Sequence, residues 1–213
     1  GIHGLHTGVF LNGQRQAFVG SACTLEILDT NGKLINRMPQ FWGQVSHFAI
    51  VNGQDGSLNL LASPKYNGVN QVAIINNRTL DPNPRGFDSV PAGSTHVSGW
   101  SSMNRSHLFY EDLDGDGEKE VISEINGTWN RVTVWTKSGK ALYDASFGPG
   151  ERIPVKNMRD LAVADLDGDG KKEILAATSA GLVVALDNRC RKLWARRLAD
   201  APVVMKCVKP SPQ

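Results

Sequence analysis

The chain has 213 residues, of which 40% are hydrophobic and 21% charged, so its composition suits a globular domain long enough to bury a core. Its formal net charge of +2 points to no class of partner, and no apolar run approaches the roughly 18 residues that a membrane-spanning helix needs. The 22 Gly and 10 Pro predict many tight turns, and because apolar residues do not recur at helical spacing we expect an all-β fold.

The first half of the chain contains two units of strand, turn and strand. Residues 9–20 hold the turn Asn12-Gly13 and lead into a further strand and turn over residues 24–33. Residues 48–62 place Asp55-Gly56 between two apolar runs in the same way. Residues 80–105, rich in Pro, Gly and Ser, are interpreted as a long loop after the second unit.

The second half contains two units that resemble each other closely. Residues 107–123 and 161–176 each place an acidic, Gly-containing loop between apolar runs, and two more short strands follow in each unit. A four-stranded sheet cannot bury both faces alone, so such units stack radially as blades, and we predict a β-propeller of four-stranded antiparallel blades. The predicted blades cover approximately residues 7–43, 45–90, 106–149 and 160–200.

Residues 201–208 resemble the first strand of another blade. This strand either closes a four-bladed ring or begins the next blade of a larger propeller, of which this chain would be a part. The pattern does not choose between the two.

Two loops share one acidic spacing that predicts a metal site in each. They are Asp112-x-Asp114-x-Asp116-Gly117-x-x-Glu120 and Asp165-x-Asp167-x-Asp169-Gly170-x-x-Glu173. Alternate carboxylates curl around one centre, the last Glu returns as a further ligand, and the main-chain carbonyls of Glu118 and Lys171 are expected to add one more. Oxygen ligands in this number suit Ca²⁺ better than Mg²⁺, so we predict two calcium ions. The second unit has Val51 and Gly53 where the later loops have Asp, and no ion is predicted there.

An EF-hand begins with the same spacing but is excluded by the residues after position 9 of each loop. An EF-hand loop needs Glu at position 12 and a helix on either side, whereas Ser123 and Ala176 stand there, within strand-like segments.

An apolar run followed by Asp-x-Asp-Gly-Asp-Gly-x-x-Glu and a second apolar run resembles the FG-GAP/VCBS repeats of integrin-α-type propellers. The resemblance is specific over residues 107–148 and 160–200, whereas the earlier units match only in their succession of strands and turns. It implies calcium in the loop between the first two strands of a blade. It also implies a mostly extracellular family that serves adhesion, carbohydrate binding or scaffolding.

The leading functional prediction is therefore a calcium-stabilised binding or scaffolding module, secreted, periplasmic or at the cell surface, rather than an enzyme. Its partner would be a protein or a carbohydrate. Trp42, Trp100 and Trp129 are candidate contacts in loops, whereas Trp135 and Trp194 are expected to pack in the core. No nucleic-acid partner is expected, because the basic residues near position 190 lack the aromatic platforms that such binding uses.

Two alternatives remain open from the sequence. The chain would belong to a polysaccharide lyase or to a quinoprotein-like enzyme, whose tryptophan-docking motif is faintly similar to residues 185–194, although Arg191 replaces its Gly. Alternatively it is a self-associating structural subunit, a homo-oligomer or a ring completed by another chain, since an incomplete ring leaves strand edges near residues 8–13 and 201–208.

Overall fold

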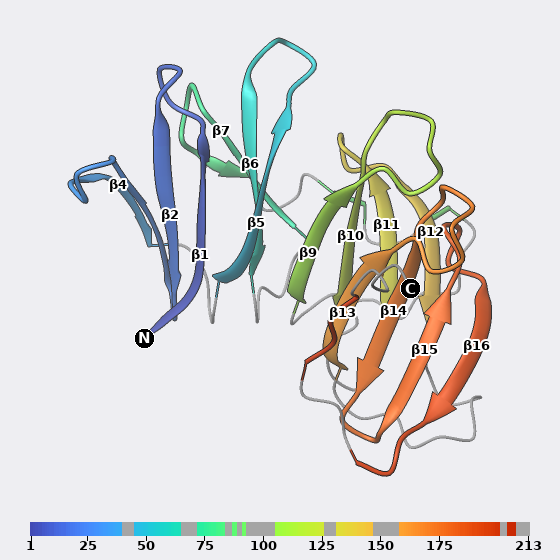
Figure 1. Ribbon diagram of the computed structural model, residues 1–213. Coiled ribbons are helices and arrows are strands. Elements are labelled where there is room, and N and C mark those ends of the chain that lie inside the picture. Colours follow the sequence, from blue (N-terminus) through green and yellow to red (C-terminus); the bar gives the residue numbers. More distant parts are fainter. Residues whose placement is uncertain are drawn as a thin grey trace, which may run out of the picture.

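The computed structural model describes residues 1–39, 45–64, 72–83, 87–88, 91–92, 105–125, 131–146, 158–200 and 204–207. Within these residues the chain is all-β and forms four antiparallel sheets of four strands each, which we call blades 1 to 4 in chain order (Figure 1). In every blade the strands lie side by side in the order of the sequence. The predicted all-β fold of four-stranded antiparallel blades is confirmed.

Each blade is built from strands of two to eight residues. Blade 1 contains β1 (Ile2–Val9), β2 (Arg15–Ser21), β3 (Thr24–Leu28) and β4 (Leu34–Pro39). Blade 2 contains β5 (Val45–Asn52), β6 (Leu58–Pro64), β7 (Ala73–Asn76) and β8 (Pro82–Asn83). Blade 3 contains β9 (Arg105–Glu111), β10 (Glu120–Ile125), β11 (Arg131–Thr136) and β12 (Ala141–Ser146). Blade 4 contains β13 (Met158–Ala164), β14 (Glu173–Thr178), β15 (Leu182–Leu186) and β16 (Lys192–Arg197).

Turn chemistry fixes the hairpins at the positions that the sequence indicated. Asn12 and Gly13 have φ of 53° and 67°, and the amide of Gln14 donates to the carbonyl of Leu11 at 2.9 Å. Two successive residues with positive φ are typical of the type I′ turn, whose twist matches that of antiparallel strands. This turn joins β1 to β2 in register, with Val9 opposite Arg15.

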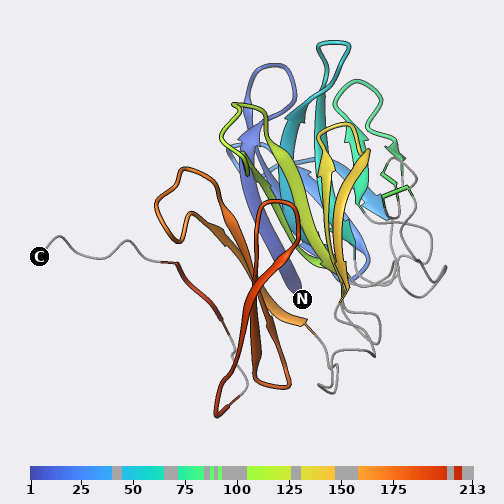
Figure 2. The same ribbon diagram turned by 90° about the vertical axis from the view of Figure 1, so that its right-hand side faces the viewer.

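The blades pack against one another through apolar faces, and the first strands of successive blades are neighbours (Figures 1 and 2). Between blades 3 and 4, Ile122 and Val134 lie in one buried cluster with Ile174 and Val184. Two further clusters join blades 1 and 2 and blades 2 and 3. The approach of blade 1 to blade 2 is so close that a Cβ on Gly4 would lie 2.2 Å from the carbonyl oxygen of Ser46.

Three features outside the acidic loops differ from the sequence-based expectations or were not anticipated by them, in addition to the tryptophans described below. Blade 1 begins at Ile2 rather than near residue 7. Within the expected loop of residues 80–105, Phe87 is buried against Trp135, whose ring it meets edge-on at 5.6 Å between centroids. Of the strand expected over residues 201–208, the structure describes residues 204–207, and these do not form a strand. The amide of Met205 donates instead to the side chain of Asp160.

The described residues contain no helix that is long and apolar enough to cross a membrane.

Candidate functional site

The two acidic loops occupy equivalent positions, between the first and second strands of blades 3 and 4. In each loop the first Asp closes the bend by accepting hydrogen bonds from two glycine amides. Asp112 accepts those of Gly115 and Gly117, at 2.8 and 3.0 Å. Asp165 accepts those of Gly168 and Gly170, at 2.7 and 3.1 Å. These four glycines have φ between 80° and 90°, a conformation that other residues rarely adopt. The repeated spacing therefore folds into one repeated bend, flanked by strands, and the exclusion of an EF-hand is confirmed.

Each bend gathers three carboxylates that could hold a metal ion. Ligand oxygens of Asp112, Asp114 and Glu120 lie within 4.8 Å of one another. The same is true of the equivalent residues of blade 4, Asp165, Asp167 and Glu173. Oxygen ligands alone at such spacing suit a hard divalent cation such as Ca²⁺.

The other predicted metal ligands stand outside these three-carboxylate clusters. The Asp116 and Asp169 carboxylates accept the amides of Glu118 and Lys171, each at 2.8 Å. The Glu118 side chain forms an ion pair of 2.6 Å with Lys137. The predicted contribution of Glu118 and Lys171 through their main-chain carbonyls stays a prediction.

Electrostatic repulsion within the blade 3 cluster shows in Glu120. Burial raises the pKa of Glu120, the hydrogen bond from the Leu113 amide opposes this, and the charges of Asp114, Asp116 and Asp112 raise the pKa further. A bound cation would relieve the repulsion that these carboxylates exert on one another.

The two bends touch each other across the interface of blades 3 and 4. The Lys172 amide donates to the Leu113 carbonyl at 2.9 Å, and the Lys172 ammonium group bonds Glu111 at 2.8 Å. A Cβ on Gly115 would lie 3.4 Å from the Gly170 carbonyl oxygen. The two candidate metal sites are therefore direct neighbours on one rim of the molecule.

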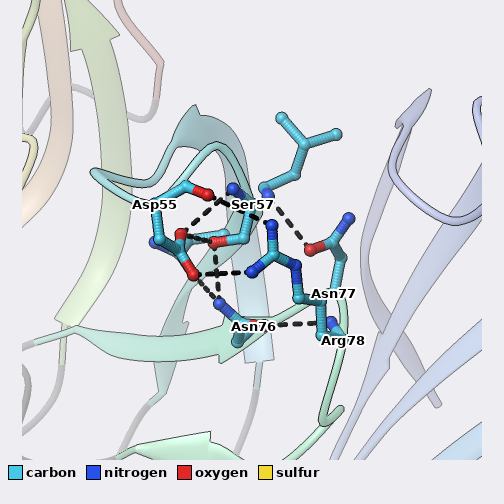
Figure 3. A network of polar contacts seen from close by, with 7 residues as sticks. Asp55, Ser57, Asn76, Asn77 and Arg78 are labelled. Atoms are coloured by element: carbon cyan, nitrogen blue, oxygen red, sulfur yellow. Dashed lines mark hydrogen bonds and ion pairs between the residues drawn. The ribbon is translucent and has the colours of Figure 1, made fainter.

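The equivalent bend of blade 2 is closed by an arginine (Figure 3). Val51 is buried in the core and Gly53 has no side chain, so two ligand positions are lost. Asp55 instead accepts the amide and hydroxyl of Ser57 through one oxygen, and Arg78 donates to its other oxygen at 3.0 Å and to its carbonyl at 3.1 Å. Sequence reasoning missed this pair, because Arg78 lies in another turn, 23 residues further on.

A second polar cluster joins the opposite ends of the first strands of blades 2, 3 and 4. Glu124 has no exposed surface, and it accepts a hydrogen bond of 2.7 Å from His107 Nδ1 and one of 3.1 Å from the His107 amide. His107 Nε2 lies 3.2 Å from Asp160, and the ring of His47 lies 4.9 Å from that of His107. Sequence reasoning missed this cluster too. Its signal was the polar Glu124 within the apolar run of the third unit.

The tryptophans divide differently from the prediction. Trp135 is fully buried, as expected, and donates to the Asp88 carbonyl at 2.8 Å. Trp194 was expected in the core but is 42% exposed on β16. Trp42, Trp100 and Trp129 lie outside the described residues.

Part of the chain resembles a known protein family. Residues 141–211, about a third of the chain, match the family described as the lambda-carrageenase beta-propeller domain. Among curated protein sequences, none matches the chain.

Solved structures with this arrangement of strands are propellers. The chain is similar to BBS1N in its complex with ARL6DN, at 12% identity and a TM-score of 0.55, over 94% of this chain and 52% of that one. It is similar to the Dos1 propeller and to the Pan2 WD40 domain of Neurospora crassa, each at 14% identity and a TM-score of 0.51. These matches cover 94% of this chain, and 47% and 51% of the other chains. The chain thus has a β-propeller fold and spans about half the length of the propellers it matches.

Proposed function

We propose that this chain is a calcium-stabilised β-propeller module that binds a protein or carbohydrate partner. The observation that supports the proposal is the pair of equivalent acidic bends, each with three converging carboxylates. Two such bends in direct contact concentrate negative charge on one rim, and divalent cations would neutralise it. The FG-GAP/VCBS type of repeat belongs to this proposal, on the strength of the acidic spacing in blades 3 and 4.

We place the module outside the cytoplasm, because exposed oxygen sites of this kind fill at the millimolar calcium of extracellular fluids. In this setting the ion has a structural role: it stiffens the rim on which a partner would bind. A ligand that binds the folded state alone stabilises it by about 2.7 kcal/mol at 100 times its dissociation constant.

Thermal unfolding in calcium and in chelator tests the proposal. We expect the wild type to melt several degrees higher in calcium, since about 1 kcal/mol shifts the melting of a domain of this size by roughly 2–4 °C. Asp167→Ala removes a carboxylate of the blade 4 cluster and should abolish much of this increment. Asp81→Ala, an exposed carboxylate outside the clusters, is the control and should keep it. Equal melting of the wild type in both solutions would contradict the proposal.

A second candidate function is favoured by the family match alone. The matched domain is that of a lambda-carrageenase, so this chain would be the propeller of a polysaccharide-degrading enzyme. Incubation with λ-carrageenan and measurement of new reducing ends tests this candidate, and binding without new ends favours the binding module. The quinoprotein alternative has less support, because Trp194 of the similar motif is exposed rather than docked in the core.

A further inference from the structure

A groove separates blades 2 and 3 on the rim that carries the acidic bends. It encloses about 770 Å³, within the range of small-molecule sites. One wall comes from the bend between β5 and β6 together with the end of β7, and the other from the acidic bend of blade 3 and the turn after β11. Ile74 and Leu142, both half-buried, supply an apolar part of the lining.

The blade 2 wall is rich in amides and is fixed by the Arg78 network (Figure 3). Asn76 donates to Ser57 at 2.9 Å and to the Asn59 side-chain oxygen at 3.1 Å, and Ser57 is itself held by Asp55. Asn59 therefore keeps its amide hydrogens for a ligand, as far as the described residues go. Asn52 is exposed at the groove, and its side chain makes no hydrogen bond within the described part of the chain. These amide groups could donate hydrogen bonds to a ligand from a wall that the internal hydrogen bonds hold in place.

The blade 3 wall is rich in carboxylates, which accept hydrogen bonds. Asp114, Asp116, Glu118 and Glu120 line it, with Lys119 and Lys137. Lys137 forms an ion pair with Glu118 on this wall, and Arg78 forms one with Asp55 on the blade 2 side. With one divalent ion in the bend, the negative and positive charges of the groove come close to balance. A strongly charged ligand would gain little there.

We propose that this groove binds a neutral saccharide. Hydroxyl groups both donate and accept, so one sugar can satisfy the carboxylate wall and the amide wall together, while the C–H face of a pyranose ring packs on Ile74 and Leu142. A purely anionic ligand would meet the carboxylates, and a purely cationic one the amide donors and lysines. This inference rests on the proposed function, because it takes the partner to be a carbohydrate and the blade 3 bend to hold its ion.

Isothermal titration calorimetry in calcium tests the groove. The probes are neutral tetrasaccharides of glucose, mannose, galactose and xylose, with a galacturonate tetrasaccharide and tetralysine as charged counterparts. We expect at least one neutral tetrasaccharide to bind more tightly than both charged probes. Asn52→Ala, which removes an exposed amide of the groove, should weaken that binding about fivefold, the effect of one lost hydrogen bond. Asn31→Ala, an exposed amide of blade 1, is the matched control and should bind as the wild type does.

Three outcomes would overturn the inference: no neutral probe binds at millimolar concentration, a charged probe binds most tightly, or Asn52→Ala binds like the wild type. Melting in calcium and chelator separates this failure from that of the proposed function. If the protein melts higher in calcium but binds no sugar, the proposed calcium sites stand and the proposed sugar site fails. If the protein binds sugar in the groove but melts equally in both solutions, the sugar site stands and the calcium sites fail.

Discussion

Glu124 is a buried carboxyl group whose side chain contacts His107. A carboxylate without exposed surface is costly unless a hydrogen-bonded cation compensates it. His107 fills that role as an imidazolium, with Glu124 at Nδ1 and Asp160 at Nε2, while the second oxygen of Asp160 accepts the Met205 amide. This arrangement joins blade 3 to blade 4 and to the segment after β16.

The contact of His107 with Glu124 and Asp160 should make stability depend on pH near neutrality. Burial alone would lower the pKa of His107, but the hydrogen bond and charge of Glu124 and the charge of Asp160 raise it above 6.5 overall. The stabilisation is therefore complete below about pH 6.5 and is lost as the pH rises through the higher pKa of the folded state. Urea unfolding at a series of pH values should show this loss in the wild type.

The matched variant is His107→Gln, which keeps a side-chain donor but cannot titrate. It should be less stable by about 3–5 kcal/mol at mildly acidic pH, because Glu124 loses its cation, and its stability should vary less across neutrality. Other titratable or charged side chains near His107 are those of His47, Arg159, Lys206 and Cys207. Parallel pH curves for the two proteins would show that His107 does not account for the pH dependence.

At the scale of elements, four equivalent bends are closed in three ways. In blade 1 the neutral side chain of Gln16 accepts the amides of Phe10 and Leu11. In blade 2 Arg78 holds Asp55, and in blades 3 and 4 carboxylates converge on a proposed ion. The same hairpin thus tolerates a neutral or a cationic closure, and a metal-dependent closure in blades 3 and 4 under the proposed function, provided that its amides find acceptors.

This difference predicts where chelation acts. Hydrogen exchange should quicken in residues 112–120 and 165–173 when calcium is removed, and residues 53–58 should not respond. Arg78→Ala should quicken exchange in residues 53–58 equally in calcium and in chelator. Its cost to global stability should be small, because both side chains of the ion pair are more than half exposed and solvent screens their attraction. A calcium response in residues 53–58 of the wild type would contradict this account.

The elements themselves were predictable because each depends on neighbours in the sequence. Apolar runs separated by Asn-Gly or Asp-Gly turns specify hairpins locally, and the repeat of Asp112–Glu120 at Asp165–Glu173 marks equivalent bends. Two acidic clusters appeared where the spacing predicted them, although Asp116 and Asp169 do not join them.

The features that escaped prediction depend on contacts between distant segments. Arg78 reaches Asp55 from another turn, and His107 and Asp160 meet because two blades pack together. Trp194 has the hydrophobicity of a core residue, and its exposure is decided by which face of blade 4 another element covers. No local spacing encodes such contacts.

At the scale of the whole molecule, the four blades follow one another in a row, with blade 1 at one end and blade 4 at the other (Figures 1 and 2). Gly4 and Gly8 of β1 face blade 2, so by alternation Leu5 and Val9 point away from it, and they are 68% and 43% exposed. At the other end Leu175 and Ala185 point away from blade 3. Met205 packs there, beside the exposed Trp194 that pairs with Ala185. Each end of the row thus exposes apolar side chains, beside the Glu26–Arg37 ion pair on the face of blade 1 that carries Leu5.

The exposed apolar side chains at the two ends, Leu5 and Val9 on blade 1 and Trp194 on blade 4, should lead the isolated chain to pair with a second copy, blade 4 of one against blade 1 of the other. Two copies would supply the blades of a full propeller, since one copy spans about half of the propellers it matches. Light scattering after size exclusion should give a mass above that of one chain, rising with concentration. Leu5→Lys should return it to one chain by placing an unpaired charge in the contact. Gln14→Lys, on the rim of blade 1, should leave it unchanged. A wild type that stays at the mass of one chain at every concentration would contradict this prediction.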